Sequence, residues 1–450
     1  MVKNLTVGTP VIQILTFAIP LFIGNIFQHS YNIADTFIVG HLIGSNALAA
    51  VGSTGSISFL IIGFINGFGI GAAILTAQRF GAGDSEGVRK SFAATIIAST
   101  GFAVVLTIIS VLCARPLLEF LQTPAEIIDD SFGYIVTIFI GIPTVVLFNL
   151  FSNVLRSVGD SRTPLYFLAI ACVLNIVLDL VFILVFNTGL WAIALATVIS
   201  QFVSGMLCLL FIIKKMPLLY LTKSDWVIDK SEISKHLKLA LPVGFQMSII
   251  AIGSVTVTYA LNQIGTTAIG AYTAANRVDL LAFMILYSFG GAMTTYSAQN
   301  FGAGKFDRIR KGIAHISIIA CIYCFVIAAI FYFSGHFFPS IFLGNETAEI
   351  LSMARFYLIV NSFCYIFLAM LFIIRQSLMG MGDKVTPTLA SIMELTMRIL
   401  AALILGEAFG FPGICFANPL AWAGAMIPLT IAFIIKMKKL RKEEIIKLHE

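Results

Sequence analysis

The sequence predicts an all-α polytopic membrane protein with twelve transmembrane helices in two six-helix lobes, related by a pseudo-two-fold axis along the membrane normal. The first observation is composition, because 59% of the 450 residues are hydrophobic and only 11% are charged, whereas soluble domains are about a quarter charged. The second is a series of long apolar segments, and the third is an internal repeat. Together they exclude a soluble globular protein, whose cores could not bury so much apolar surface.

Twelve segments have the length and hydropathy of membrane-spanning helices, each of which needs about 20 apolar residues. A β-barrel would instead show alternating segments of about 10 residues. The glycine-rich run "GFGIGA" lies inside one apolar segment with no strand before it, so its glycines indicate close helix packing or bending rather than nucleotide binding. Spans are expected near residues 11–39, 47–78, 91–113, 131–155, 163–186, 190–213, 239–262, 267–298, 313–334, 356–380, 386–406 and 411–436.

The distribution of Lys and Arg predicts the orientation. With twelve spans, the side that holds the N-terminus collects 24 of these residues, and the opposite side holds two, Arg115 and Arg355. Because basic loops stay in the cytoplasm, both termini are expected there, in a multi-pass protein of the cell (inner or plasma) membrane. The net charge of +6 then reflects orientation and contact with anionic membrane lipids, and no nucleic-acid partner is expected.

The chain repeats itself. "AQRFGAGDSEGVRK" at 77–90 returns as "AQNFGAGKFDRIRK" at 298–311 with 8 of 14 positions identical, and "GDSRTP" at 159–164 returns as "GDKVTP" at 382–387. Each repeat holds six spans, so both enter the membrane from the same side, as in parallel-repeat transporters. The predicted organisation is a six-helix lobe at 1–213, a charged cytoplasmic linker at 214–238, a second six-helix lobe at 239–436 and a basic cytoplasmic tail at 437–450.

Over essentially its whole length the chain resembles the bacterial type of the multidrug and toxic compound extrusion (MATE) family. The likeness rests on the Pro20-bearing first span with "YNIADTFIVG", the doubled "FGAG", "GDSRTP", and "LNIVLDLVF" at 174–182. It implies a secondary active transporter that exports cationic or amphipathic drugs or metabolites in exchange for H⁺ or Na⁺ by alternating access. The expected partners are such small molecules and membrane lipids, with function as a monomer, no catalytic residues, and no cofactor or metal besides the coupling ion.

Four acidic residues fall well inside spans, and carboxylates there are expensive and mark functional sites. They are Asp35, Asp179, Asp279 and Glu394. Gln28, Asn32 and Asp35 follow a spacing of i, i+4, i+7, which places them on one face of the first helix, and Asn175 and Asp179 are spaced i, i+4. Two carboxyl groups with neutral oxygen donors suit a proton or monovalent cation. The alternative is that these polar groups only bond helices together.

The resemblance implies that this first-lobe site comprises Asp35, Asn175 and Asp179, together with Tyr134 and Thr197 by their positions along their spans. It also implies that the first span bends at Pro20. Asp35 has no acidic counterpart in the second repeat, where the matching positions are 256–258. Ion coupling is therefore expected in the first lobe alone.

The second lobe offers a possible cavity formed by Asp279, Glu394 and Arg398. Glu394 and Arg398 are spaced i, i+4, which suits either a structural ion pair or a pair that lines the cavity. A flippase for a lipid-linked precursor is the alternative function, since it has a related repeat plan. Such a cavity should hold several basic groups for phosphates, and only Arg277 and Arg398 are placed inside spans, which favours the exporter.

Overall fold

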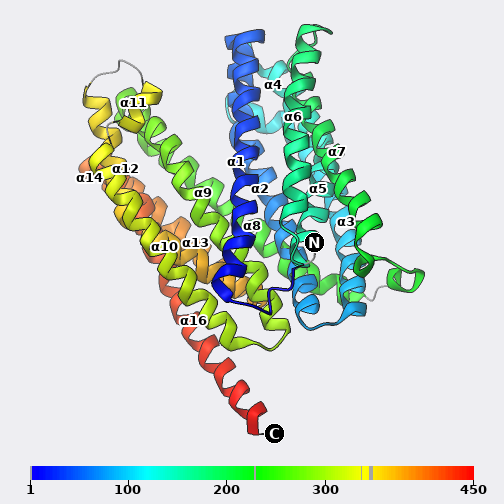
Figure 1. The fold of residues 1–450 in the computed structure, drawn as a ribbon. Helices are drawn as coiled ribbons and strands as arrows, with labels where there is room; N and C mark the ends of the chain where they lie inside the picture. The colour runs from blue at the N-terminus through cyan, green and yellow to red at the C-terminus, as the bar shows by residue number, and fades with distance from the viewer. Residues whose placement is uncertain (1–2, 228–229, 336, 344–347, 450) are drawn as a thin grey trace. The chain divides into compact units, whose positions relative to one another are not determined.

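The computed structural model describes every residue except 1–2, 228–229, 336, 344–347 and 450, and Figure 1 shows its fold. Across these residues the chain forms helices and short connections, and no strand. The helices are α1 (Pro10–Ile38), η1 (Val39–Ile43), α2 (Ser45–Gly81), α3 (Ser85–Phe120), α4 (Ile128–Ile140), α5 (Ile142–Ser157), α6 (Arg162–Leu184), α7 (Trp191–Lys215), η2 (Pro217–Leu219), η3 (Lys223–Trp226), α8 (Lys230–Ile264), α9 (Thr266–Gly302), α10 (Phe306–Ser334), α11 (Phe337–Leu343), α12 (Ala348–Gly380), α13 (Val385–Leu400), η4 (Ala401–Leu405), α14 (Gly406–Phe409), α15 (Phe411–Cys415) and α16 (Ala417–His449).

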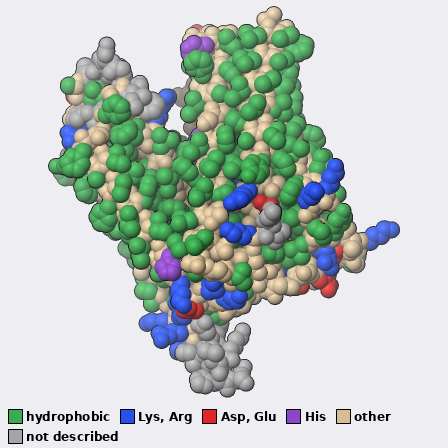
Figure 2. Space-filling model, in the orientation of Figure 1, with side chains coloured by type: hydrophobic (Ala, Val, Ile, Leu, Met, Phe, Trp, Pro, Cys, Tyr) green, Lys and Arg blue, Asp and Glu red, His purple; other side chains and the backbone are tan. Residues whose placement is uncertain are grey.

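Among the described residues, eleven helical segments are long and apolar enough to cross a membrane, and the pair α4 and α5 forms a twelfth, broken one. The predicted fold class, an all-α polytopic membrane protein, is therefore confirmed. The surface agrees with a lipid surrounding, because large apolar side chains such as Leu112, Phe325 and Phe333 are 72%, 72% and 83% exposed. Apolar side chains cover much of the face in Figure 2, and an apolar surface of this extent marks contact with another apolar phase.

The fourth span departs from the predicted continuous segment at 131–155. It consists of α4 and α5, which are bent by 41° at a break between Ile140 and Ile142. Pro143 lies in the first turn of α5, where its missing N–H is tolerated but cannot continue the hydrogen bonds of α4. Gly141 at the break packs so closely on Val198 of α7 that a Cβ there would overlap that side chain.

The chain divides into two compact units whose boundaries fall inside two helices. One unit comprises Ile19–Met247 with the N-terminal residues up to Asn4, and the other comprises Leu5–Ala18 with the chain from Ser248 onward. The beginning of α1 therefore belongs to the second unit, and the beginning of α8 belongs to the first. Helix α8 starts at Lys230, so the last part of the expected 214–238 linker is helical. Similarly, α16 continues through most of the expected 437–450 tail.

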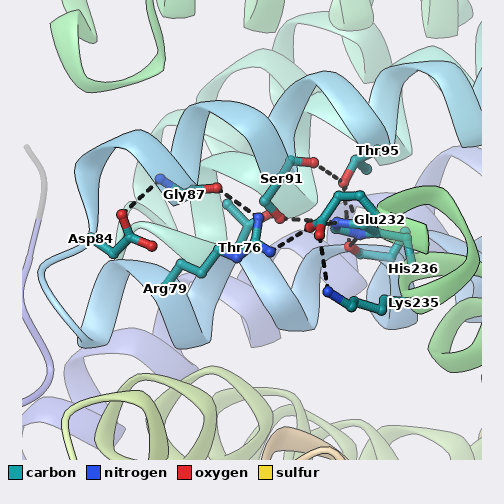
Figure 3. A network of polar contacts seen from close by, with 10 residues as sticks. Thr76, Arg79, Asp84, Gly87, Ser91, Thr95, Glu232, Lys235 and His236 are labelled. Carbon is teal, nitrogen blue, oxygen red and sulfur yellow. Dashed lines mark hydrogen bonds and ion pairs between the residues drawn. The ribbon is translucent and has the colours of Figure 1, made fainter. Parts of the chain in front are cut away.

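Polar contacts attach the beginning of α8 to α2 and α3 in the first unit (Figure 3). His236 is fully buried; its Nδ1 lies 2.9 Å from the carbonyl oxygen of Ala72 and its Nε2 lies 3.1 Å from Oγ of Ser91. Because a carbonyl oxygen can only accept, Nδ1 carries a hydrogen. One turn earlier, Glu232 forms an ion pair with Arg79 of α2. These buried partners explain why a charged segment is helical here.

Two glycines of α2 allow α2 and α8 to pack closely against each other. A Cβ at Gly71 would lie 2.7 Å from Cα of Ala240, and one at Gly67 would overlap the carbonyl oxygen of Val243. Both glycines belong to the "GFGIGA" run, so the expected role in close helix packing is confirmed. Elsewhere in the first unit, α7 packs on α4, α5 and α6, which places one face of α7 inside the lobe.

In the second unit, α12 packs on α9, α10 and α16, and α13 packs on α16. The segment that precedes α1 is held by hydrogen bonds to this unit. The N–H of Leu5 donates to Oε1 of Gln299 at 2.9 Å, and Nδ2 of Asn300 donates to the Leu5 carbonyl oxygen at 3.3 Å. Arg308 also donates to the Leu5 carbonyl oxygen, at 3.2 Å. These bonds attach the segment around Leu5 to the region of the second "FGAG", at 301–304.

Candidate functional site

The fold brings together the two carboxyl groups that the sequence singled out in the first lobe. Asp35 on α1 and Asp179 on α6 lie within hydrogen-bonding reach of each other. Asp179 is fully buried and Asp35 is 9% exposed. Their positions in sequence are 144 residues apart, so only the packing of α1 against α6 creates the pair.

The three other residues expected at this site lie beside the pair. Asn175 stands one turn before Asp179 on α6, and its Nδ2 donates to Oγ1 of Thr197 on α7 at 3.4 Å. Thr197 in turn lies within reach of Asp35. Tyr134 on α4 is close enough to interact electrostatically with both carboxyl groups. Four helices of one lobe therefore contribute to a single polar cluster.

Four side-chain oxygens of this cluster lack donors among the described residues. Among the described residues, neither oxygen of Asp179 has a hydrogen-bond partner, and the same holds for Oδ1 of Asp35 and Oδ1 of Asn175. Two buried carboxylates in contact repel each other strongly, and burial disfavours the charge of each. The pair therefore needs a shared proton or a monovalent cation to compensate its charge. This arrangement is suited to reversible binding of a small positive charge.

The remaining polar residues of the first span are less buried than Asp35. Gln28 is half-buried and lies within reach of the Tyr31 hydroxyl, whereas Asn32 is exposed. The expected common face of Gln28, Asn32 and Asp35 therefore continues from the lobe interior to its surface, and the cluster itself includes only Asp35. Pro20 lies within α1, two residues beyond Ala18, where the chain passes from one compact unit to the other.

Asp279 in the second lobe has the opposite environment. It is 8% exposed and lies on α9. Tyr365 donates a hydrogen bond to its Oδ1, and Tyr357 donates to its Oδ2 at 3.5 Å. Nδ2 of Asn418 in turn donates to the Tyr357 hydroxyl at 3.3 Å. Each oxygen of this carboxyl group has a protein donor, so a positive ligand would gain less here than at the Asp35–Asp179 pair.

Glu394 and Arg398 form the ion pair that their spacing suggested, with Nη2 of Arg398 2.8 Å from Oε1 of Glu394. A third member joins them, because Nη2 of Arg375 on α12 lies 2.6 Å from Oε2 of Glu394. Arg375 is 1% exposed, although it is one of the 24 basic residues that the sequence places on the side of the N-terminus. Each oxygen of Glu394 thus has its own guanidinium partner, which favours a structural role over a cavity-lining one.

Sequence reasoning missed Arg375, Tyr357 and Tyr365. Arg375 lies near the end of an apolar run in α12, and a basic residue near a span end is normally assigned to the interface. The tyrosines carried no local signal, because their partner Asp279 is about 80 residues away in sequence. One signal could have pointed to Arg375. The carboxylate of Glu394 has two oxygens, and the sequence suggested only Arg398 as a partner, which left room for a second basic residue.

Comparison with known proteins identifies the family of this chain. The sequence matches the family described as MatE twice, over residues 20–181 and 242–404. The chain belongs to the MatE family. The two matches coincide with the internal repeat, and membership makes the protein a membrane transporter rather than an enzyme.

Individual MatE relatives match over most of the chain. The probable multidrug resistance protein YoeA of Bacillus subtilis is 28% identical over 91% of this chain and 90% of that protein. The probable multidrug resistance protein YpnP of the same organism is 30% identical over 68% of each. A solved multidrug resistance MATE family transporter of the MOP superfamily superposes with a TM-score of 0.89 at 22% identity, over 98% of both chains. This last likeness shows that the two share the two-lobe MATE fold.

Proposed function

We propose that this MatE transporter exports cationic or amphipathic drugs or metabolites in exchange for H⁺ or Na⁺, by alternating access in the cell membrane with both termini in the cytoplasm. The names of the Bacillus subtilis relatives support drug export. The coupling site is the cluster of Asp35, Asp179, Asn175, Thr197 and Tyr134. The observation that carries this assignment is that three carboxylate oxygens of the Asp35–Asp179 pair are buried without a donor among the described residues.

The energetics of one bound charge are adequate for export. Moving one elementary charge across a potential of 100 mV provides about 2.3 kcal/mol, and a tenfold ion gradient provides about 1.4 kcal/mol. One-for-one exchange of the ion for a neutral amphipathic substrate moves net charge and could therefore support a substrate gradient of roughly a few hundredfold, whereas exchange for a monovalent cation is electroneutral and could use only the roughly tenfold ion gradient. A single site that binds one proton or one monovalent cation is sufficient for this task.

The second lobe supports the exporter over a lipid-linked-precursor flippase. A flippase cavity needs basic groups that are available to bind phosphates. The buried arginines Arg375 and Arg398 both donate to the single carboxylate of Glu394, so each is already engaged by a protein partner, although one positive charge of the three-residue cluster is not compensated by Glu394.

Transport in proteoliposomes tests the proposal. Purified protein is reconstituted, a fluorescent organic cation is supplied, and proton and sodium gradients are imposed separately. The wild type should transport the cation under at least one gradient. Asp35→Asn and Asp179→Asn should lose this gradient-driven transport, because an amide cannot bind and release a positive charge. The matched control is Asp130→Asn, which alters an exposed acid at the start of α4. Wild-type transport in both amide variants would contradict the assignment of the coupling site.

A further inference from the structure

The segment between α7 and α8 lies on the cytoplasmic side in the proposed topology and packs on the first compact unit. Helix α7 ends at Lys215, and the described residues that follow it continue through η2 and η3 to Val227. Both of these short helices contact α3. In Figure 1 this green segment extends sideways from the helices of the unit instead of continuing the line of α7. It therefore presents a surface of its own beside the end of α7.

The inner side of this segment is fixed to α3. Met216 and Leu219 are 4% and 2% exposed and belong to an apolar cluster that includes residues of α3. Oδ2 of Asp225 lies 3.4 Å from Nε of Arg89, in the second turn of α3. The same oxygen accepts hydrogen bonds from the N–H and the hydroxyl of Thr222, at 2.8 and 2.7 Å. These contacts hold the segment at the level of the first two turns of α3.

The outer side of the segment combines large apolar side chains with basic ones. The exposed apolar side chains are Tyr220, Trp226 and Val227, at 55%, 48% and 82%. Three lysines are also exposed and form no ion pair among the described residues, namely Lys214, Lys215 and Lys223. The one acidic residue within 214–227, Asp225, is buried and paired with Arg89. The outer side is therefore both apolar and positively charged.

This surface lies where apolar spans end. The apolar run of α7 stops at Ile213, and the helix then ends with two lysines. Helix α6 begins at Arg162, and the ring of Phe167 in its second turn lies 6.1 Å from the ring of Phe211 near the end of α7. Basic residues therefore mark the ends of two neighbouring spans at one depth. Trp and Tyr concentrate at the boundary between hydrocarbon and water, and Lys and Arg accompany them on the cytoplasmic side.

We propose that the outer side of residues 214–227 docks on the anionic headgroup layer of the membrane that the protein spans. Trp226 and Val227 then exchange water for the boundary of the acyl chains, which is favourable for apolar surface. The three lysines contact lipid phosphates. Each lysine close to an anionic membrane surface favours association about fivefold, and three favour it about a hundredfold. This docking does not depend on the ion-coupling site.

Charge complementarity selects a lipid partner over a second copy of the chain. A second copy would present the same lysines, and like charges that face each other across a contact repel. A headgroup layer supplies phosphates and accepts aromatic and apolar side chains at the same time. A zwitterionic layer could accept Trp226 but has no net charge for the lysines, so docking should depend on the content of anionic lipid.

Fluorescence quenching of Trp226 tests the docking. The chain has three tryptophans, so the signal of Trp226 is the difference between the wild type and Trp226→Phe, each reconstituted in vesicles of phosphatidylglycerol and acyl-brominated phosphatidylcholine. The brominated lipid should quench this signal strongly, and acrylamide in the buffer should quench it weakly. Quenching by acrylamide without quenching by the lipid would overturn the proposal. Protection from both would also overturn it, because a protein surface would then cover Trp226.

Neutralising the lysines tests the role of charge. The quenching of Trp226 is measured as phosphatidylglycerol replaces unbrominated phosphatidylcholine, at a constant content of brominated lipid. Quenching should increase with phosphatidylglycerol in the wild type, and this dependence should be lost when the three lysines of the segment are changed together to Gln. The matched control changes three exposed lysines of the other compact unit to Gln and should behave like the wild type; they are Lys384, Lys438 and Lys439. A wild-type dependence on phosphatidylglycerol in the first triple variant, or an equal loss in the control, would overturn the assignment of anionic lipid to this surface.

Discussion

Glu394→Gln is expected to be the most destabilising single substitution of the buried charge cluster in the second lobe. Glu394 receives hydrogen bonds at 2.6 Å from Arg375 and 2.8 Å from Arg398, and the two arginines are 1% and 7% exposed. The substitution leaves both guanidinium groups buried without a counter-charge. Removing one partner of a buried ion pair costs about 3–5 kcal/mol, so the free energy of unfolding should fall by about this amount.

Arg398→Gln provides the discriminating comparison. It leaves Glu394 paired with Arg375, which is a neutral combination. The expected loss is one hydrogen bond to a charged group, about 1.5–3 kcal/mol, and it is partly offset because one buried charge disappears. Gly253 of α8 lies against the Arg398 guanidinium, where a Cβ would be 2.6 Å from Nη1, so removal of this side chain also leaves some space unfilled. Glu394→Gln should therefore be the more damaging of the two.

The assay is thermal unfolding of the purified protein in detergent. Glu407→Gln, which makes the same chemical change at an exposed position, is the control and should leave the apparent melting temperature unchanged. Glu394→Gln should lower it most and Arg398→Gln should lower it less. The charge argument would be refuted if Glu394→Gln behaved like the control, or if Arg398→Gln were the more destabilising change.

Three further outcomes follow from the structure. Pro20→Ala should slow turnover more than it weakens drug binding, because the proline removes a backbone hydrogen bond within α1; unchanged turnover in a transport assay would show that Pro20 is only a tolerated kink. A cysteine at Lys223, which is exposed, should react with an impermeant reagent in inside-out but not right-side-out vesicles, and the opposite pattern would overturn the topology. Hydrogen bonds from Thr222 hold the pKa of Asp225 below its ordinary value, so the turn they form should persist at neutral pH and be lost only as the pH falls through that lowered value. Asp225→Asn should accordingly increase amide hydrogen exchange at residues 222–226 at pH 7. Unchanged exchange would show that the Asp225 carboxylate does not stabilise the turn.

The sequence predicted those features that depend on local pattern. Hydropathy located each span, although α8 and α12 begin at Lys230 and Ala348, ahead of the predicted starts at 239 and 356, and the i, i+4 spacing placed Asn175 beside Asp179 and Glu394 beside Arg398. The proximity of Asp35 and Asp179 was expected from their shared lobe and from the family resemblance, because spacing along one helix says nothing about a helix 144 residues away. The break at Gly141 was missed, although Pro143 just after it was a local signal for an interrupted helix; only the close contact of Gly141 with Val198 was invisible in the sequence.

Features that depend on tertiary packing could not be predicted. The exchange of the beginnings of α1 and α8 between compact units depends on contacts such as His236 with Ala72 and Leu5 with Gln299, which join segments far apart in sequence. Likewise, the donors around Asp279 and the lack of donors around Asp179 are both invisible in the sequence. That difference distinguishes a carboxyl group whose oxygens have protein donors from one whose oxygens have none among the described residues.

The central claim is that the Asp35–Asp179 pair exchanges a small cation for the drug, and ion release upon drug binding tests it most directly. Purified protein in weakly buffered detergent is mixed with saturating drug, while a pH indicator and a sodium-selective electrode record what is released. The wild type should release about one proton or one sodium ion per bound drug, the stoichiometry of a single exchanged charge. The Asp35→Asn/Asp179→Asn double variant should bind the drug and release neither ion. Ion release of wild-type size from the double variant, or drug binding by the wild type with no release at all, would contradict the account.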